Sequence, residues 1–515
     1  MTSRRTIGLG LVLLALPSLA LAQGRSSRRG QDKAETEEAA LCENSEEVFA
    51  PFVTEVAAGN VGPAMDTLAV VLNNGELAGC HGQAWIRLGG LLEKEGFGYA
   101  GALAWSEGMK LDPEASSKQV VTRFLELGTE VGDQALLEET FAGNVGFDAD
   151  KETRSHIAYL GARGAYVQGN YSTALGILAL VDMKGPDAEK ALALKGVVLA
   201  QQNRYNDALV ALLTAQAQIK DPELLDTVNL NIGRTYYASG NYPRAIEYYA
   251  KVRRESHFWP EAQFERGWAH FRIQDVNGAL GILHTHTTEF YGEWYFPEAE
   301  LLRTYSLFLI CKFPEASSEI DKFQARWTPF RDDLEPQIAG MSAQDVWADG
   351  RSFVESGESE LPAMVIRDLP FDKTFTEAMS SVDAADKELS LLEGRSGEWV
   401  SFAQGMLKER RDSLIQSNGQ RVKDSVEADV RELSSMLTDT EIAKLDMLRL
   451  ETKLYEQAAE IGQIPDAQRK AERKERVRRG YQSWPYEGEI WADELGYYRV
   501  NAKMECPPGL MQSGK

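Results

Sequence analysis

The sequence predicts an all-α fold, in which a helical solenoid is followed by a further helical region. The first observation is a series of alanines that recur every 33 to 39 residues, close to the period near 34 of helical solenoids. The second is a small or modest residue twelve positions before each of the last five alanines, which suits closely crossing helices. The third is a charged pattern with helical spacing from about residue 373. The alanines are Ala64, Ala102, Ala135, Ala174, Ala208, Ala245, Ala279 and Ala316.

Residues 1–22 have the pattern of a secretion signal. Arg4 and Arg5 precede a thirteen-residue apolar core, and Ala20-Leu21-Ala22 is a small-x-small cleavage site. The core is too short to cross a bilayer, and no later apolar stretch predicts a transmembrane span. We therefore expect an exported chain that begins near Gln23 and is periplasmic, either free or associated with the outer membrane.

Residues 23–42 are polar and are expected to form a disordered lead to the solenoid. Cys42 and Cys80 lie one repeat apart, at the starts of adjacent units. Because an exported protein meets an oxidising compartment, this spacing predicts a disulfide between them. Cys311 falls on a predicted first helix and is expected to be a buried free thiol.

Residues 43–325 contain the repeats, each of which we interpret as a helix hairpin. In the clearest unit Gly233 and Ala245 are the small residues, Tyr236 and Tyr249 are larger neighbours, and Gly240-Asn241-Tyr242-Pro243 is the turn. This pattern resembles the tetratricopeptide repeat. The resemblance implies a right-handed superhelical solenoid whose first helices line a concave groove.

The resemblance also places aromatic and arginine side chains in that groove. Such a surface suits an extended peptide or a helix that carries carboxylates. The alternative is that the C-terminal helices fill the groove in cis, since the ends of a solenoid need capping. The predicted groove residues are Arg234, Tyr237, Phe264, Trp268, Phe271, Arg272, Tyr305 and Phe308.

Residues 326–372, with Pro336, Pro362 and Pro370, are expected to be a connector or an irregular helical cap. Residues 373–480 are charged and helical in pattern. Breaks at Gly394 to Gly397 and at Asn418-Gly419 would give hairpins, and the alternative is one long helix. Thr438-Asp439-Thr440-Glu441 is a capping box that predicts a helix restart. A coiled-coil-like seam of Val426, Val430, Leu433 and Leu437 continues as a stripe of Ile442, Leu445 and Leu448.

A basic patch lies near the end of this region. It is expected to contact an acidic partner or anionic lipid head groups at a membrane surface, or else to be a solvated helix end. The patch consists of Arg469, Lys470, Arg473, Lys474, Arg476, Arg478 and Arg479.

Residues 481–515 form an aromatic C-terminal segment. Aromatic anchors are ordered only where they are buried, either against the protein's own helices or in a partner. The segment from Trp484 to Arg499 resembles the C-terminal part of exported repeat proteins of myxobacteria and relatives, some assigned to adventurous gliding motility. This resemblance implies a periplasmic adaptor for other envelope proteins. The predicted anchors are Trp484, Tyr486, Trp491, Tyr497 and Tyr498.

The sequence contains no recognisable catalytic or cofactor motif. A net charge of −23 argues against nucleic acid as a partner. His284 and His286 are two residues apart and would not face the same way on a helix, so no metal site is predicted. The sequence therefore predicts a non-enzymatic scaffold without cofactors. The alternative is an accessory factor that recruits a cell-wall or outer-membrane-assembly enzyme.

Overall fold

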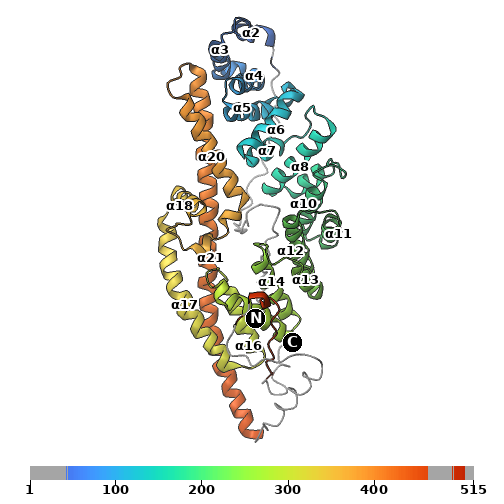
Figure 1. Ribbon diagram of the computed structural model, residues 1–515, viewed down its shortest axis with the longest axis vertical. Helices are drawn as coiled ribbons and strands as arrows, with labels where there is room; N and C mark the ends of the chain where they lie inside the picture. Colours follow the sequence, from blue (N-terminus) through green and yellow to red (C-terminus); the bar gives the residue numbers. More distant parts are fainter. Residues whose placement is uncertain (1–41, 43, 462–489, 491, 505–515) are drawn as a thin grey trace. The chain divides into compact units, whose positions relative to one another are not determined.

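The computed structural model describes residues 42, 44–461, 490 and 492–504 of the chain. Every regular element in these residues is a helix, so the predicted all-α fold is confirmed (Figure 1). The chain divides into two compact units. The first unit is Met1–Gly240, Gly340–Pro362 and Ile366–Val426, and the second is Asn241–Ala339, Ala363–Val365 and Glu427–Lys515.

The repeat helices of the first unit follow one another as antiparallel hairpins. After the short helix α1 (Ser45–Val48), the pairs are α2 (Ala50–Ala57) with α3 (Val61–Asn73), α4 (His81–Lys94) with α5 (Gly98–Leu111), α6 (Lys118–Val131) with α7 (Gln134–Phe141), α8 (Lys151–Val167) with α9 (Tyr171–Leu178), and α10 (Ala188–Gln201) with α11 (Tyr205–Gln216), followed by α12 (Pro222–Ala238). The second unit contains α13 (Tyr242–Tyr249), α14 (Trp259–Arg272), α15 (Val276–Leu283), α16 (Pro297–Leu309) and α17 (Phe313–Gly340).

In each repeat hairpin we call the later helix the second helix. The recurring alanines lie within the first five residues of these second helices, which are α3, α5, α7, α9, α11, α13, α15 and α17. Seven of the eight are completely buried, and Ala135 is partly buried. Small residues let the paired helices approach: a Cβ at Gly196 would collide with the side chain of Leu212. In the α4–α5 hairpin the close approach is at Gly89 and Gly101, whereas a Cβ at the adjacent Gly90 would meet no atom within 4 Å.

Each second helix is preceded, two positions before its first residue, by a residue with positive φ. This left-handed conformation reverses the chain between the paired helices, and glycine adopts it at the lowest cost. Glycine occupies five of these turns, and Asn203, Gln274 and Cys311 occupy the other three.

Two disulfides involve described cysteines. One joins Cys42 to Cys80, the pair predicted from the spacing. Cys311 is also disulfide-bonded, so the expectation of a free thiol is wrong. The expectation placed Cys311 within a repeat helix as a buried apolar side chain. In the structure Cys311 lies just after the end of α16, in a left-handed turn.

The C-terminal part of the first unit is a helical hairpin, α20 (Lys373–Leu392) and the first part of α21 (Glu398–Ile461). The turn between them contains Gly394 and Gly397, both with positive φ. The region therefore contains one of the two predicted hairpin turns, the one at Gly394 to Gly397. After that turn it forms a single helix of 64 residues, as the alternative predicted. Asn418-Gly419 does not break that helix. Gly419 instead lets the Ala343 carbonyl of α18 (Ala343–Ser356) approach the α21 backbone.

The residues expected to form a connector are mostly helical. Helix α17 continues from Phe313 to Gly340, across the predicted end of the repeats at residue 325. Pro329 and Pro336 lie inside it, but both are exposed. The buried face, which includes Trp327 and Leu334, is therefore uninterrupted. The short elements α19 (Ala363–Ile366) and η5 (Leu369–Phe371) complete the segment.

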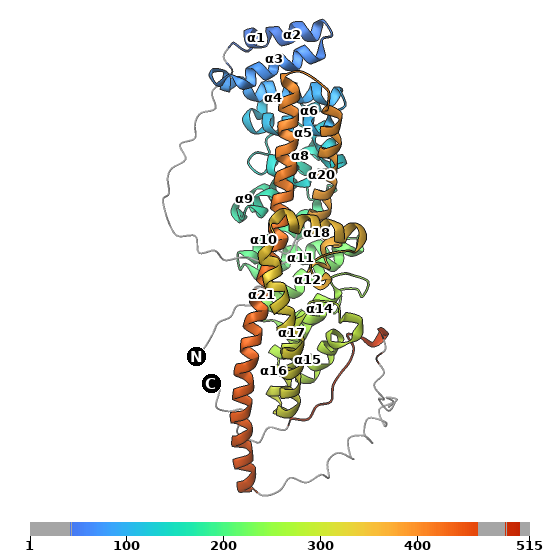
Figure 2. The ribbon, with the colours of Figure 1, turned by 90° about the vertical axis from the view of Figure 1, so that its left-hand side faces the viewer.

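The predicted seam of α21 is buried. In the second unit, Leu433 and Leu437 share a cluster with Leu301 of α16 and with Phe323 and Trp327 of α17. Figure 2 shows α17 alongside this part of α21. The seam therefore packs on the repeat helices rather than on a separate coiled-coil partner.

The expected helix restart within α21 is wrong. The helix does not restart at the Thr438 to Glu441 box, where the Thr440 hydroxyl is buried and donates to the Leu437 carbonyl at 2.6 Å. The continuing stripe of Ile442, Leu445 and Leu448 does not pack like the seam, because each side chain is more than half exposed. In this part of α21, Met447 is the buried residue, and it shares a cluster with Leu307 of α16 and Ile320 of α17.

Candidate partner-binding grooves

The predicted groove residues on α14 lie together in the second unit. Phe264, Trp268 and Phe271 are partly buried and pack on a cluster that includes Ala279 and Leu302. The Trp268 and Phe271 rings meet edge to face, with centroids 5.6 Å apart. These aromatics therefore contribute to the core of the repeats as well as to a surface.

The predicted groove residues on α16 face the protein's own C-terminal helix. Tyr305 packs on the cluster that Leu433 and Leu437 of α21 share, and Phe308 packs on the cluster that contains Met447. Within the second unit, this part of the predicted groove is filled in cis.

The remaining predicted groove residues are either hydrogen-bonded or buried. Arg272 is exposed, and its Nη2 donates to the Tyr242 hydroxyl at 2.7 Å. Arg234 and Tyr237 lie on α12 in the first unit and are only 2% and 8% exposed.

Three carboxylates meet where α16 packs on α21 in the second unit. Burial and the charge of Glu432 raise the pKa of Glu298 to about 7, and burial and the same charge raise the pKa of Asp429 to about 7. The Tyr295 hydroxyl donates to the Asp429 carbonyl at 3.0 Å. A rise in pH through about 7 would therefore add negative charge to this interface.

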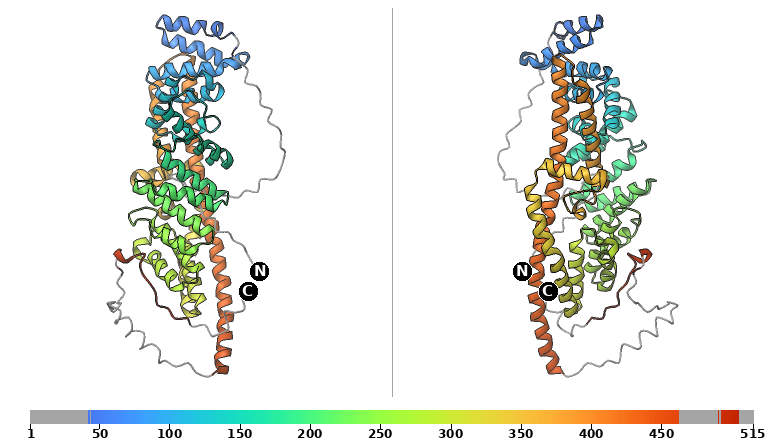
Figure 3. Two further views of the ribbon diagram at one scale, coloured as in Figure 1. Left: turned by 90° about the vertical axis from the view of Figure 1, so that its right-hand side faces the viewer. Right: turned by 60° about the vertical axis from the view of Figure 1, so that its left-hand side comes forward.

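The aromatic segment docks in cis where the structure describes it. Leu495 is buried, the Gly496 amide donates to the Thr285 hydroxyl at 2.9 Å, and the Tyr498 ring lies 5.2 Å from that of His284. Figure 3 shows the segment beside α14 and α15 in two views. Tyr497 remains 76% exposed and is an accessible aromatic anchor. The anchors Trp484, Tyr486 and Trp491 lie outside the described residues, as does the basic patch from Arg469 to Arg479.

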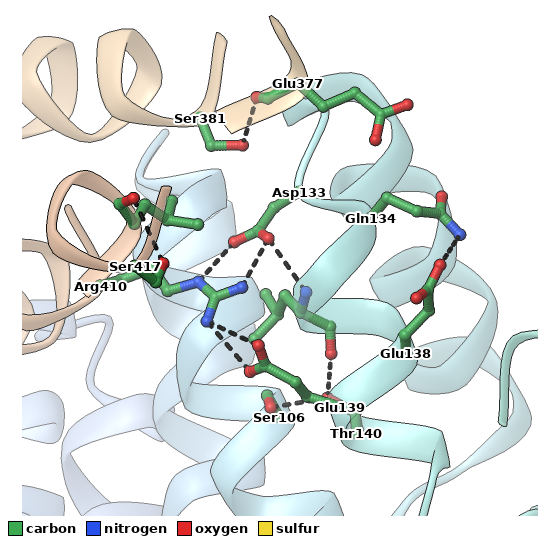
Figure 4. A network of polar contacts seen from close by, with 12 residues as sticks. Ser106, Asp133, Gln134, Glu138, Glu139, Thr140, Glu377, Ser381, Arg410 and Ser417 are labelled. Carbon is green, nitrogen blue, oxygen red and sulfur yellow. Dashed lines mark hydrogen bonds and ion pairs between the residues drawn. The ribbon is translucent and has the colours of Figure 1, made fainter. Parts of the chain in front are cut away.

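In the first unit the α20–α21 hairpin is held on the repeats by buried charges. Arg410 donates through Nη2 to Asp133 Oδ1 at 2.6 Å and through Nε to Asp133 Oδ2 at 2.7 Å (Figure 4). Asp133 also accepts from the Tyr99 hydroxyl at 2.7 Å, and Arg410 reaches Glu139 at 3.0 Å. Burial alone would lower the pKa of Arg410. The hydrogen bond to Asp133 and the negative charge of Asp133 outweigh burial and raise that pKa.

A second carboxylate from the hairpin caps a repeat helix. Glu388 of α20 accepts from the Tyr99 and Ala100 amides at 2.7 and 2.9 Å. These amides belong to the first turn of α5, where Phe97 provides no side-chain cap. On α21, the Trp399 amide donates to Asp66 of α3 at 3.0 Å. The hairpin therefore completes hydrogen bonds that the repeats leave open.

An open groove of about 800 Å³ remains beside this contact in the first unit. Its apolar lining includes Trp85, Leu103, Leu136, Phe402 and Met406. Most of the repeat side comes from the second helices α3, α5 and α7, whereas the resemblance implied a groove on the first helices. The sequence analysis missed this groove because α21 forms one wall, and nothing in a single sequence indicates which helices it packs on.

The histidines have structural partners. Burial lowers the pKa of His286 to about 4, and the ring bonds the Pro260 carbonyl at 2.8 Å. His270 bonds Asp275 at 2.9 Å. Among the described residues, no group of three or more His, Cys, Asp or Glu side chains is arranged to hold a metal ion.

Within the described part of the chain, no helix combines the length and apolar character that crossing a bilayer requires.

Comparisons with known proteins point to the repeats. Residues 159–222 and 230–283 match the family model described as tetratricopeptide repeat. No curated protein matches the chain. Among solved structures, a tetratricopeptide repeat protein from Parabacteroides merdae is 13% identical, with a TM-score of 0.25 over 51% of this chain and 98% of that one. The apo form of RapI is 13% identical, with a TM-score of 0.33 over 67% of this chain and 98% of that one.

The complex of Naa15 and Naa10 bound to HypK-THB contains a chain that is 14% identical. Its TM-score is 0.26, over 80% of this chain and 62% of that one. Scores this low give no basis for a functional inference. By the family match, residues 159–222 and 230–283 are similar to tetratricopeptide repeats.

Proposed function

We propose that this protein is a non-enzymatic scaffold of the bacterial envelope that holds protein partners on its repeat array and through its aromatic C-terminal segment. Tetratricopeptide-repeat proteins generally mediate protein–protein interactions. The observation that carries the proposal is the open groove between the second helices and α21, which has an apolar floor and charged edges. Such a surface is typical of binding sites for other molecules.

The exported location is part of the proposal. It rests on the signal-like residues 1–22, and the disulfide between Cys42 and Cys80 is in keeping with an oxidising compartment. The more specific role, in a gliding-motility assembly, rests on the resemblance of the aromatic segment alone. Exposed Tyr497 offers this segment an anchor for a partner.

Photo-cross-linking in living cells tests the scaffold function. A photoreactive residue at Ser401, an exposed position that lines the groove, is expected to capture a specific partner. A photoreactive residue at Tyr497 tests the aromatic segment. The control is a photoreactive residue at Glu152, which is exposed on α8 and lies outside the groove. Capture of motility proteins would support the specific role. Capture of a cell-wall or outer-membrane-assembly enzyme would favour the accessory role, and no capture beyond the Glu152 control would overturn the scaffold.

The location is tested separately by the N-terminus of the protein isolated from cells. We expect a periplasmic protein that begins near Gln23. A cytoplasmic protein that retains Met1 would contradict export.

A further inference from the structure

We propose that the open groove of the first unit binds a short protein segment in which apolar side chains lie between two basic side chains. This inference rests on the scaffold function proposed above and adds the chemistry of the partner. It concerns the groove on the second helices, which is distinct from the first-helix groove that the repeat pattern implies.

The wall formed by α21 sets the length of the site. Glu398, Phe402, Gly405 and Glu409 all line the groove. They are spaced by 4, 3 and 4 residues, so they form one line along the helix. The two glutamates are about 16 Å apart along the axis, at a rise of 1.5 Å per residue. An extended chain covers that distance in about five residues.

The floor between the two glutamates is apolar. Leu103 and Leu136 are buried beneath it, and Trp85, Phe402 and Met406 are partly buried. The Trp85 and Phe402 rings meet edge to face, with centroids 5.8 Å apart, so the repeat side and the α21 side of the floor are in contact. Leucine-sized side chains of a bound segment would cover this floor and exclude water from it.

The charges at the groove select a cationic segment. Its two basic residues already have partners, because Lys110 pairs with Glu107 at 2.9 Å and Arg410 is held by Asp133 and Glu139. Glu398 and Glu409 are exposed and form no ion pair with any residue that the structure describes. An acidic segment would meet like charge at both ends, whereas a lysine or arginine at each end would meet a carboxylate.

Gly405 keeps the middle of the groove open. A Cβ placed there would have no atom within 4 Å. Glycine within a helix is less favourable than alanine, and here no close packing requires it. The absence of a side chain leaves space on the line between the two glutamates.

The test measures binding of a fluorescein-labelled peptide, Lys-Leu-Ala-Leu-Lys, to the purified full-length chain by fluorescence anisotropy. We expect sub-millimolar binding that weakens as salt is added, and no comparable binding of Glu-Leu-Ala-Leu-Glu. Equal binding of the two peptides, or no detectable binding of the lysine peptide, would overturn the proposal.

Two variants of one position test the location. Gly405→Leu fills the groove and should weaken the lysine peptide at least about tenfold, while Gly405→Ala should leave the Kd within about threefold. Both substitutions favour the helix, so a folding defect is not expected, and thermal unfolding checks this. Wild-type binding by a folded Gly405→Leu variant would place the peptide elsewhere and overturn the proposal.

A matched pair of charge variants tests the selectivity. Glu398→Gln with Glu409→Gln should weaken the lysine peptide about tenfold. Glu152→Gln with Glu358→Gln removes the same charge from exposed positions outside the groove and should have little effect. Equal losses in the two double variants would show a general charge effect and contradict the site. If the peptide fails to bind but cross-linking at Ser401 still captures a partner, the scaffold stands and only the chemistry inferred for its ligand is wrong.

Discussion

Replacement of Arg410 by methionine should loosen the α20–α21 hairpin from the repeats of the first unit. Methionine retains much of the aliphatic stem but removes the guanidinium that Asp133 and Glu139 share. The Asp133 side chain is 1% exposed, so its charge would lose its principal counter-ion without gaining contact with water.

The expected loss follows from the partners that remain. Removing one member of a buried ion pair costs about 3–5 kcal/mol. Asp133 would still accept from the Tyr99 hydroxyl at 2.7 Å and from the Leu136 amide at 2.9 Å, which favours the lower end of that range. The lost contact to Glu139 adds little, because that side chain is 50% exposed. We therefore expect a loss of about 3 kcal/mol, or roughly a hundredfold in the opening equilibrium.

Amide hydrogen exchange is the suitable measurement, because it reports local opening in a chain with two units. Exchange in α7 and in residues 398–413 should become roughly a hundredfold faster in Arg410→Met. The control is Arg411→Met on the same helix turn, where the partners Asp386 and Asp412 are more than half exposed. If Arg410→Met changes exchange no more than Arg411→Met does, the buried pair does not hold the hairpin.

Three further expectations concern other parts of the chain. Burial raises the pKa of Asp429 to about 7, so its contribution to stability is present below its unfolded value of 3.8 and is lost as pH rises through about 7. The melting-temperature difference between Asp429→Asn and the wild type should therefore grow across that interval and level off above it; a constant difference would refute this. Loss of the Cys42–Cys80 disulfide, which closes a loop with a sequence separation of 38, should cost about 4 kcal/mol, seen as faster exchange in α2 and α3 in the double serine variant; unchanged exchange would contradict it. In α21, Gly419→Ala should destabilise by about 1–3 kcal/mol through the Ala343 contact, whereas Gly405→Ala should stabilise by up to about 1 kcal/mol; urea titrations that give both changes the same sign would refute the packing.

The repeat region was predictable because its signals are local. The recurring alanines mark contacts between helices adjacent in sequence, and the glycines in the turns follow from backbone conformation at single positions. Even here, side-chain packing decided which glycine of Gly89-Gly90 faces the partner helix. Asn203, Gln274 and Cys311 adopt the same left-handed turn without glycine, so a search for glycine alone would miss them.

The groove and the path of the C-terminal helices were not predictable, because they depend on contacts between residues hundreds of positions apart. Arg410 reads in the sequence as one charge in a charged helix, and only the structure pairs it with Asp133. Thr438 to Glu441 has the local pattern of a helix start, yet burial of Thr440 within continuous α21 overrides that preference. The stripe from Ile442 to Leu448 has helical spacing, but spacing alone does not show whether a neighbouring element covers it.

The cap that Glu388 places on α5 has a consequence for the order in which the protein folds. The carboxylate arrives 288 or 289 residues after the amides it accepts from, and Trp399 meets Asp66 across a separation of 333. During vectorial synthesis, the early hairpins would emerge long before the segment that completes them. Contacts of such long range slow folding and leave apolar surface exposed meanwhile. The amide groups at the start of α5 would therefore lack this cap until the region around residue 400 has emerged.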